Sequence, residues 1–289
     1  MNAYLRRAAG RVFKLTSLPF LLLLATAVAS PARAAVNVRV EARPASEPIE
    51  VFITVTDNAG NPLGGHDSSD FTVTIDGDPV TIAPGDLTLP PSQDPNQRVS
   101  VVFTMDYSPS VVNAARADME QAVVDFIDNM NDGDYAAIVK FNATNPNGAS
   151  IVAPFTEVVN GAGNNPTLEA AARSDYPGNG TNLLDALALS LDHILSPPSA
   201  LPQGPKAVLL VSDGGEFDAA TEQSEVFALA NDNSIPIFTI GVADVSEPGF
   251  EELLEALAGE TGGEYFPAPT PENIAEAYDT ILVRLQNEY

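Results

Sequence analysis

The sequence predicts an α/β protein with a doubly wound, mostly parallel sheet, preceded by a small β-sandwich-like module. Two observations carry this prediction. From residue 98 onwards, apolar stretches of strand length alternate with amphipathic stretches of helix length, which is typical of a parallel sheet covered by helices on both faces. Before that point, short alternating stretches are separated by turn residues, which is typical of antiparallel β structure.

Residues 1–34 are predicted to be a secretory signal peptide. They begin with a basic stretch without acidic residues, MNAYLRRAAGRVFK, continue with a short apolar core, LPFLLLLATAVA, and end with the small residues of ARA. The core is too short to span a membrane as a helix. We expect cleavage near Ala34 and a soluble mature protein in the periplasm or the external medium. Arg6-Arg7 raises the twin-arginine route, but the residues after the pair favour general secretion.

The remaining chain is strongly acidic. The sequence has 13 Lys and Arg against 39 Asp and Glu, and five of the basic residues lie in the first 34, so the mature chain has a net charge of −31. This charge excludes a protein that binds a nucleic-acid backbone through a basic face, and it makes acidic membranes poor partners. It indicates either a solvated surface or an affinity for divalent cations. Since the chain has no Cys, its domains must be held by core packing or by bound ions.

Residues 35–88 are predicted to form the β module. The stretches VNVRVEARP and IEVFITVTD alternate, and DFTVTIDGDPVTIAP contains two strands around Asp76-Gly77, a strong hairpin signal. The module resembles the immunoglobulin-like segment that often precedes the main domain in secreted bacterial proteins. Some of its oxygen-bearing residues could bind Ca²⁺ or could simply form turns; these are Asp57, Asn58, Asn61 and the run HDSSD at 66–70.

A Pro-rich linker, LPPSQDPNQ at residues 89–97, leads into the predicted α/β domain at residues 98–289. Its strands are predicted at 98–105, 134–142, 149–157, 206–213, 235–242 and 264–268. Its helices are predicted at 113–130, 181–195, 221–233, 250–263 and 271–286. Only ATNPNG joins the second strand to the third, which is too short for a crossover helix, so we expect this pair to be antiparallel.

Oxygen-bearing side chains follow the two most apolar strands of this domain. Asp106, Ser108 and Ser110 alternate after RVSVVF, Asp213 ends KAVLLVSD, and Thr181 opens the helix before that strand. Ligands of doubly wound sheets bind beyond the C-terminal ends of the strands, so three loops could converge there. Two carboxylates and three hydroxyls suit a hard cation such as Mg²⁺.

Each of these pieces alone also has an ordinary structural explanation. The first could be the beginning of a helix, because Ser and Asp are common N-caps. Thr181 could be the N-cap of NLLDALALSL, which does not exclude coordination, and Asp213-Gly214 could be a turn.

Taken together, DYSPS, GNGTNLLDAL and VLLVSDGGEFD resemble the three parts of the metal-ion-dependent adhesion site of the von Willebrand factor type A domain. LAGETGGEYF is similar to the last helix-to-strand passage of that family, and the resemblance covers about residues 97–289. It implies a six-stranded α/β fold with one antiparallel edge strand. Many members of the family have Gly where this chain has Pro109 and Met where it has Val111.

The resemblance also implies a ligand set and a partner. An ion of Mg²⁺, with Mn²⁺ or Ca²⁺ as alternatives, would be coordinated directly or through water, and an acidic residue of a protein partner would bind to that ion. The residues that the resemblance assigns to the ion are Asp106, Ser108, Ser110, Thr181 and Asp213.

The favoured function is therefore a secreted, non-enzymatic binding module. A non-catalytic scaffold in an extracytoplasmic assembly, with a purely structural metal, is the alternative. An acyl-transfer enzyme is disfavoured because His66 and His193 are poorly placed to activate a serine. A metal-assisted hydrolase would need an acid–base residue, for which Glu216 and Asp218 are the only weak candidates.

Overall fold

The structure is a computed structural model, and its chain divides into two units, residues 1–95 with 284–289 and residues 96–283. Each unit is described by itself. The residues that the structure describes are 2–4, 26–27, 37–43, 50–56, 63, 66–75, 78–81, 87–88, 94, 96–111, 113–143, 148–159, 165–216, 219–242, 249–268 and 270–287.

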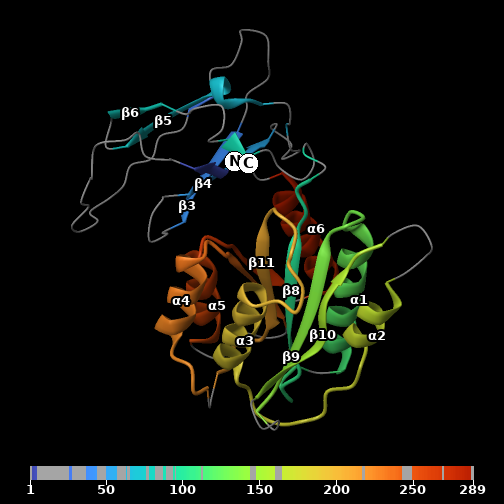
Figure 1. The fold of residues 1–289 in the computed structure, drawn as a ribbon. Coiled ribbons are helices and arrows are strands. Elements are labelled where there is room, and N and C mark those ends of the chain that lie inside the picture. Colours follow the sequence, from blue (N-terminus) through green and yellow to red (C-terminus); the bar gives the residue numbers. More distant parts are fainter. Residues whose placement is uncertain are drawn as a thin grey trace. The chain divides into compact units, whose positions relative to one another are not determined.

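The second unit contains a six-stranded sheet in the order β10-β9-β8-β11-β12-β13 (Figure 1). Its strands are β8 (Ser100–Asp106), β9 (Tyr135–Phe141), β10 (Ala149–Glu157), β11 (Lys206–Ser212), β12 (Ile237–Val242) and β13 (Tyr265–Ala268). All neighbouring strands are parallel except β10, which is antiparallel to β9 at the edge of the sheet. The predicted fold class and the antiparallel pair are therefore confirmed.

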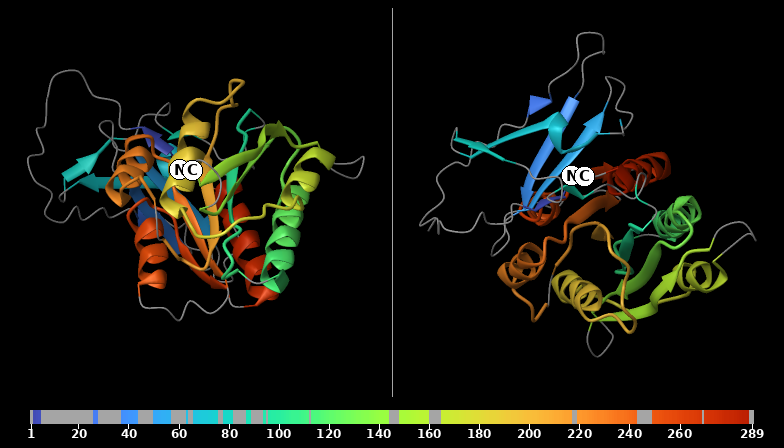
Figure 2. Two further views of the ribbon diagram at one scale, coloured as in Figure 1. Left: turned by 90° about the horizontal axis from the view of Figure 1, so that it is seen from below. Right: turned by 45° about the horizontal axis from the view of Figure 1, so that its top comes forward.

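Helices cover both faces of this sheet (Figure 2). They are α1 (Asn113–Asn129), α2 (Pro166–Ala172), α3 (Leu183–Leu195), α4 (Gln223–Asp232), α5 (Phe250–Gly259) and α6 (Pro271–Asn287). Because successive strand residues point to opposite faces, Val102 and Phe103 of β8 belong to different cores. Val102 lies in a cluster with side chains of α3, α4 and α5, whereas Phe103 packs against aromatic rings of α1 and α6.

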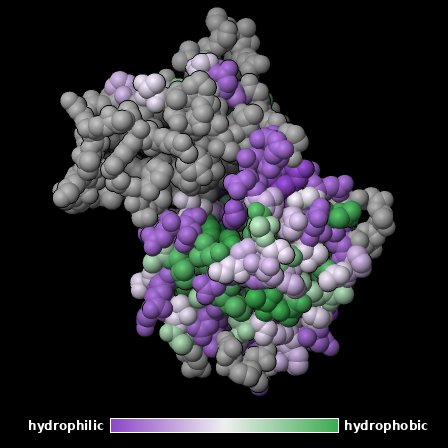
Figure 3. Space-filling model, viewed as in Figure 1, coloured by the Kyte–Doolittle hydropathy of each residue, from purple (hydrophilic) through white to green (hydrophobic). Residues whose placement is uncertain are grey.

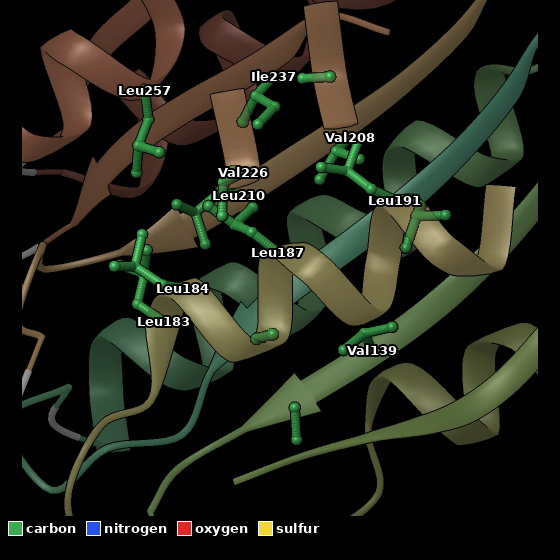
Figure 4. Packing of buried hydrophobic residues seen from close by; sticks show 14 of the residues in the cluster. Val139, Leu183, Leu184, Leu187, Leu191, Val208, Leu210, Val226, Ile237 and Leu257 are labelled. Carbon is green, nitrogen blue, oxygen red and sulfur yellow. The ribbon is translucent and has the colours of Figure 1, made fainter. Parts of the chain in front are cut away.

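The first of these cores is built from aliphatic side chains. Leu187 and Leu191 of α3 lie beside Val208 and Leu210 of β11 (Figure 4), and all four are fully buried. Complete burial of a leucine is worth about 2 kcal/mol or more, so α3 is held firmly against the centre of the sheet. The strands with the most continuous apolar sequence, β8 and β11, are the two central ones.

The edge strand β10 is poorly suited to pairing with another strand. Its register against β9 shifts between Ile151 and Ala153 and again before Thr156, and Pro154 is exposed. Bulges and proline at an edge discourage further strand addition. Figure 3 shows hydrophobic residues gathered on the visible face of the second unit around α3 and β10, with hydrophilic residues around them.

The bounds of most predicted elements of the second unit shift by one to four residues, and the helix predicted at 250–263 ends at Gly259. Two further differences concern α2 and α3. Helix α2 was not predicted, because its seven residues give too short a pattern for helical periodicity; Pro166 at its first turn is a typical start. Helix α3 begins at Leu183 rather than at Thr181, because Asn182, with φ −121° and ψ 67°, is its non-helical N-cap.

The first unit is made of short strands. These are β1 (Asn2–Tyr4), β2 (Thr26–Ala27), β3 (Asn37–Arg43), β4 (Glu50–Thr56), β5 (Phe71–Ile75), β6 (Asp78–Val80) and β7 (Leu87–Thr88), with the 3₁₀ turn η1 (Ser68–Asp70). They form a four-stranded sheet, β3-β4-β1-β7, and a three-stranded sheet, β2-β5-β6. Strands β5 and β6 form the predicted hairpin.

Several predictions for the N-terminal part concern residues that the structure describes only in part. Of the predicted signal peptide, only β1 and β2 are described, so that segment, its cleavage near Ala34, the linker boundaries and the immunoglobulin-like character stay predictions. Asp57, Asn58 and Asn61 lie outside the described residues. None of the helices that the structure describes is long and apolar enough to cross a membrane.

Candidate metal centre

The first loop of the candidate site begins at the end of β8. Asp106 is fully buried, and both of its carboxylate oxygens accept hydrogen bonds. The backbone N–H of Ser108 donates to Oδ1 at 2.7 Å, and the hydroxyl of Ser212 donates to Oδ2 at 2.6 Å. The hydroxyls of Ser108 and Ser110 are 3.0 Å apart. Ser110 is exposed, so this loop connects a buried carboxylate with the protein surface.

The third loop begins at the end of β11, the strand next to β8. Asp213 is buried, and its Oδ1 accepts a hydrogen bond from the N–H of Gly215 at 3.1 Å. Gly214 has φ +88°, and a Cβ there would lie 2.5 Å from the carbonyl oxygen of Phe250, so only glycine fits. The N–H of Gly214 donates to the hydroxyl of Ser212. Ser212 thus hydrogen-bonds both loops.

The two carboxylates repel each other in this setting. Burial, and then the negative charge of Asp213, raises the pKa of Asp106 to about 7, although the hydrogen bonds from Ser212 and Ser108 oppose this rise. Within the described part of the chain, neither carboxylate forms an ion pair with a Lys or Arg. A buried, uncompensated pair of carboxylates is stabilised by a cation.

The second loop, residues 173–182 between α2 and α3, contains Thr181. This side chain is buried. The N-cap of α3 is Asn182, the next residue, so the alternative prediction that Thr181 is the N-cap was wrong. Gly180 has φ +73° and lies so close to Ala143 that a Cβ would be 2.4 Å from the Ala143 Cβ. The N–H of Ala143 donates to Asn179 O at 2.8 Å. The second loop is therefore held against the end of β9.

Two acidic side chains join the first turn of α3 and the third loop reciprocally. Glu216, on the third loop, accepts a hydrogen bond from the N–H of Leu184 in the first turn of α3 at 2.8 Å. In return, Asp185 of α3 accepts hydrogen bonds from the N–H groups of Ala220 and Thr221. Because each contact satisfies a backbone donor, this pair keeps the third loop and the first turn of α3 in a constant relation.

The residues considered for catalysis have structural contacts. The second oxygen of Glu216 accepts a hydrogen bond from Ala219 N, so both oxygens act as backbone caps. His193 is buried, its ring stacks on Phe155 at 4.9 Å, and its Nε2 accepts a hydrogen bond from Phe155 N. Asp218 lies outside the described residues.

Replacing Glu216 tests the contribution of this cap. We expect Glu216→Ala to lower the free energy of unfolding by about 1 kcal/mol, because two backbone N–H groups lose their acceptor. Urea unfolding measures the change, with Glu276→Ala on the exposed surface of α6 as the control. Equal unfolding midpoints for the two variants would mean that the cap contributes nothing.

The chemistry of the donor set is that of a hydroxyl-rich site. The described residues hold no group of three or more His, Asp or Glu side chains placed to bind one ion. The predicted site instead combines two carboxylates with three hydroxyls, and such oxygen donors fit Mg²⁺. The sequence did not single out Ser212, although it directly precedes Asp213, because only the adjacency of β8 and β11 shows that its hydroxyl reaches Asp106.

Comparisons with known proteins bear on the fold of this domain. A family model described as von Willebrand factor type A domain matches residues 100–280, and no curated protein matches. One similar solved structure is a von Willebrand factor type A protein from Catenulispora acidiphila, at 15% identity and TM-score 0.53, covering 86% of this chain and 49% of that one. Another is the pilus adhesin SpaC from Lactobacillus rhamnosus GG, at 11% identity and TM-score 0.51, covering 91% of this chain and 36% of that one.

A third similar structure is proximal thread matrix protein 1 from the mussel byssus, at 16% identity and TM-score 0.51, covering 68% of this chain and 48% of that one. At these identities the likeness shows the fold alone. This chain spans about half of the Catenulispora chain that it matches.

Proposed function

Because the chain belongs to the von Willebrand factor type A domain family, whose domains are generally non-catalytic interaction modules, we propose that its second unit is a metal-dependent binding module. One Mg²⁺ ion, or Mn²⁺ or Ca²⁺ in its place, would bind where the loops after β8 and β11 meet. The ligands that we propose are Asp106, Ser108, Ser110, Thr181 and Asp213.

The observation that carries the proposal is the pair of buried carboxylates at the ends of two adjacent central strands. Asp106 is held through both oxygens by Ser108 and Ser212, so its orientation is fixed before any ion binds. Burial and the charge of Asp213 raise its pKa, and this unfavourable charge would be relieved by a divalent cation. The hydroxyls would add neutral oxygen ligands without further repulsion.

The proposed ligand set leaves room for a partner on the ion. Its two carboxylates balance the charge of a divalent ion, and its five side chains leave at least one position of the octahedral Mg²⁺ shell for water or an outside ligand. Pro109 and Ser110 are exposed, so an ion bound at this loop would lie next to solvent. We therefore propose that an aspartate or glutamate of a protein partner completes the coordination, in the periplasm or outside the cell.

The alternative is a scaffold in which the ion only stabilises the fold and partners bind elsewhere. A metal-assisted hydrolase is less supported, because both oxygens of Glu216 already accept backbone hydrogen bonds. The other acid–base candidate, Asp218, lies outside the described residues.

Selection from a displayed random-peptide library tests the proposal. The full chain is immobilised in Mg²⁺, washed, and eluted with a chelator. We expect the eluted peptides to share an Asp or Glu whose replacement by Asn or Gln lowers the affinity at least about tenfold. Ser110→Ala should weaken binding, whereas Ser199→Ala in the exposed loop before β11 should not. Enrichment of peptides without acidic residues, retained in chelator, would support the scaffold instead.

A further inference from the structure

A buried lysine lies behind the candidate metal centre. Lys140 is the sixth residue of β9, and it neighbours Met105 of β8 and Ser150 of β10 across the sheet. Its side chain is fully buried. It points to the face opposite to that of Val139, which belongs to the cluster with α3.

The ammonium group of Lys140 binds the end of α2 and the beginning of the second loop. Its Nζ donates to the carbonyl oxygen of Ala172 at 2.9 Å, to the carbonyl oxygen of Ser174 at 2.5 Å, and to the Ser174 hydroxyl at 3.2 Å. It also lies 4.3 Å from the centre of the Tyr107 ring, a distance at which a cation is attracted to an aromatic face. The three donors of the group are thus all used.

Tyr107 connects this lysine to the first loop. It stands between two of the proposed metal ligands, Asp106 and Ser108. Its own side chain is buried, and its hydroxyl donates to Oε1 of Glu120 at 2.6 Å and lies 3.2 Å from the carbonyl oxygen of Ala172. Its backbone N–H donates to Phe141 O at 2.9 Å. The tyrosine therefore touches α1, β9 and the end of α2 at once.

Further contacts continue along the second loop towards Thr181. The side chain of Asn142 donates to Tyr176 O, and the hydroxyl of Tyr176 donates to the Ser150 hydroxyl. The rings of Tyr107 and Tyr176 meet edge to face, with centres 5.9 Å apart. Lys140 is the only cation among these contacts that binds the backbone of the second loop directly.

Burying a cation is unfavourable, which indicates that the charge of Lys140 contributes something other than stability. An ammonium group in a protein interior is unfavourable unless it is well hydrogen-bonded, and an apolar side chain of similar volume is often at least as stabilising. A methionine could fill this position without losing hydration. Only the ammonium group supplies a connection between the carbonyl oxygens of Ala172 and Ser174 and the Tyr107 ring.

We propose that Lys140 is a positioning residue of the metal centre: it fixes the second loop to Tyr107 and so holds Thr181 in place relative to Asp106 and Ser108. This inference rests on the proposed function and adds to it a residue that is not itself a ligand. It predicts that the affinity for metal, and not only the stability of the fold, depends on Lys140.

The ammonium group of Lys140 loses its proton within a pH range in which binding can be measured, so the pH dependence of metal binding gives a second test of the proposal. Burial lowers the pKa of Lys140 to about 8; the negative charges of Glu120 and Asp175 raise this pKa, and the positive charge of Arg116 lowers it. Above this pH the amine keeps two donors but loses its charge, so its bonds to the loop weaken. The advantage of lysine over methionine should therefore decrease between pH 7 and pH 9.

The test uses the full chain, freed of metal and titrated with Mn²⁺ by calorimetry, with thermal unfolding of each metal-free sample recorded in parallel. Lys140→Met removes the charge at nearly constant volume. Tyr107→Phe keeps the ring but removes the hydroxyl contacts. Lys206→Met is the matched control, because this lysine lies at the beginning of β11, the end of that strand remote from Asp213.

At pH 7 we expect Lys140→Met to raise the Mn²⁺ dissociation constant about tenfold, Tyr107→Phe to raise it less, and Lys206→Met to leave it unchanged. The ratio of the dissociation constants of Lys140→Met and wild type should fall towards one at pH 9. Ionisations that all variants share, including that of Asp106, cancel in this ratio.

The possible failures are distinct. If the wild type shows no saturable Mn²⁺ binding, both the proposed metal centre and this inference are overturned. If the wild type binds and Lys140→Met binds equally well, with only a lower unfolding temperature, the lysine is structural and the inference alone is overturned. If Lys140→Met does not fold, Tyr107→Leu takes its place, because it removes the ring that the ammonium group contacts; an unchanged dissociation constant in Tyr107→Leu then overturns the inference.

Discussion

Asp106→Asn is expected to stabilise the metal-free protein at alkaline pH relative to wild type. Burial and the charge of Asp213 raise the pKa of Asp106 to about 7, from a reference value of 3.8. A carboxyl group whose pKa is higher in the folded state stabilises the fold fully below its unfolded pKa, and this contribution is lost as the pH rises through the folded pKa. Asparagine is neutral throughout and loses nothing.

Between pH 5 and pH 8 the difference in unfolding free energy between wild type and Asp106→Asn should change by about 3 kcal/mol. Urea unfolding in chelator at the two pH values measures it. Asp192→Asn, at an exposed position of α3, is the control. The cost of rearranged hydrogen bonds at Ser108 and Ser212 is the same at both pH values and cancels. A difference that does not change with pH would show that Asp106 ionises normally.

Addition of Mg²⁺ to the metal-free protein is expected to reverse this loss of stability. An ion that binds only the folded state adds about 2.7 kcal/mol at a concentration 100-fold above its dissociation constant. Since Asp106 must release its proton to bind metal, the stabilisation should be larger at pH 8 than at pH 6. Thermal unfolding during titration with Mg²⁺, Mn²⁺ and Ca²⁺ measures it and ranks the three ions.

Variants separate a specific site from general binding to an acidic protein. Asp106→Asn and Asp213→Asn should abolish the saturable stabilisation, whereas Asp192→Asn should retain it. An equal rise in all four proteins would indicate diffuse attraction of cations by the net charge of −26. A flat response in the wild type would contradict an ion site that is complete without a partner.

These two expectations have one physical origin. A site that binds a cation must hold its carboxylates close together before the ion arrives, and this arrangement destabilises the empty fold. The hydrogen bonds from Ser212 and Ser108 keep Asp106 in place despite the repulsion from Asp213. Removing one charge should therefore improve stability and abolish metal binding, as is common where function and stability conflict.

The sequence by itself determined the fold class and the positions of the proposed ligands. The alternation of strands and helices predicted the sheet, and the short connection ATNPNG predicted its one antiparallel pair, because both patterns are local. Asp106 and Asp213 could be placed at strand ends for the same reason. Helix α2 escaped prediction because seven residues carry too little periodicity.

Only the tertiary structure decided how these residues are held. The bond from Ser212 to Asp106 joins positions 106 residues apart, and the cap of α3 by Glu216 joins positions 32 apart. The contacts of Lys140 with Ala172 and Ser174 join positions 32 and 34 residues apart. Helical and strand periodicity depends on residues that are close in sequence. Which strands become neighbours depends on the packing of the whole domain, and this decides the ionisation of Asp106, the capping of α3 and the burial of Lys140.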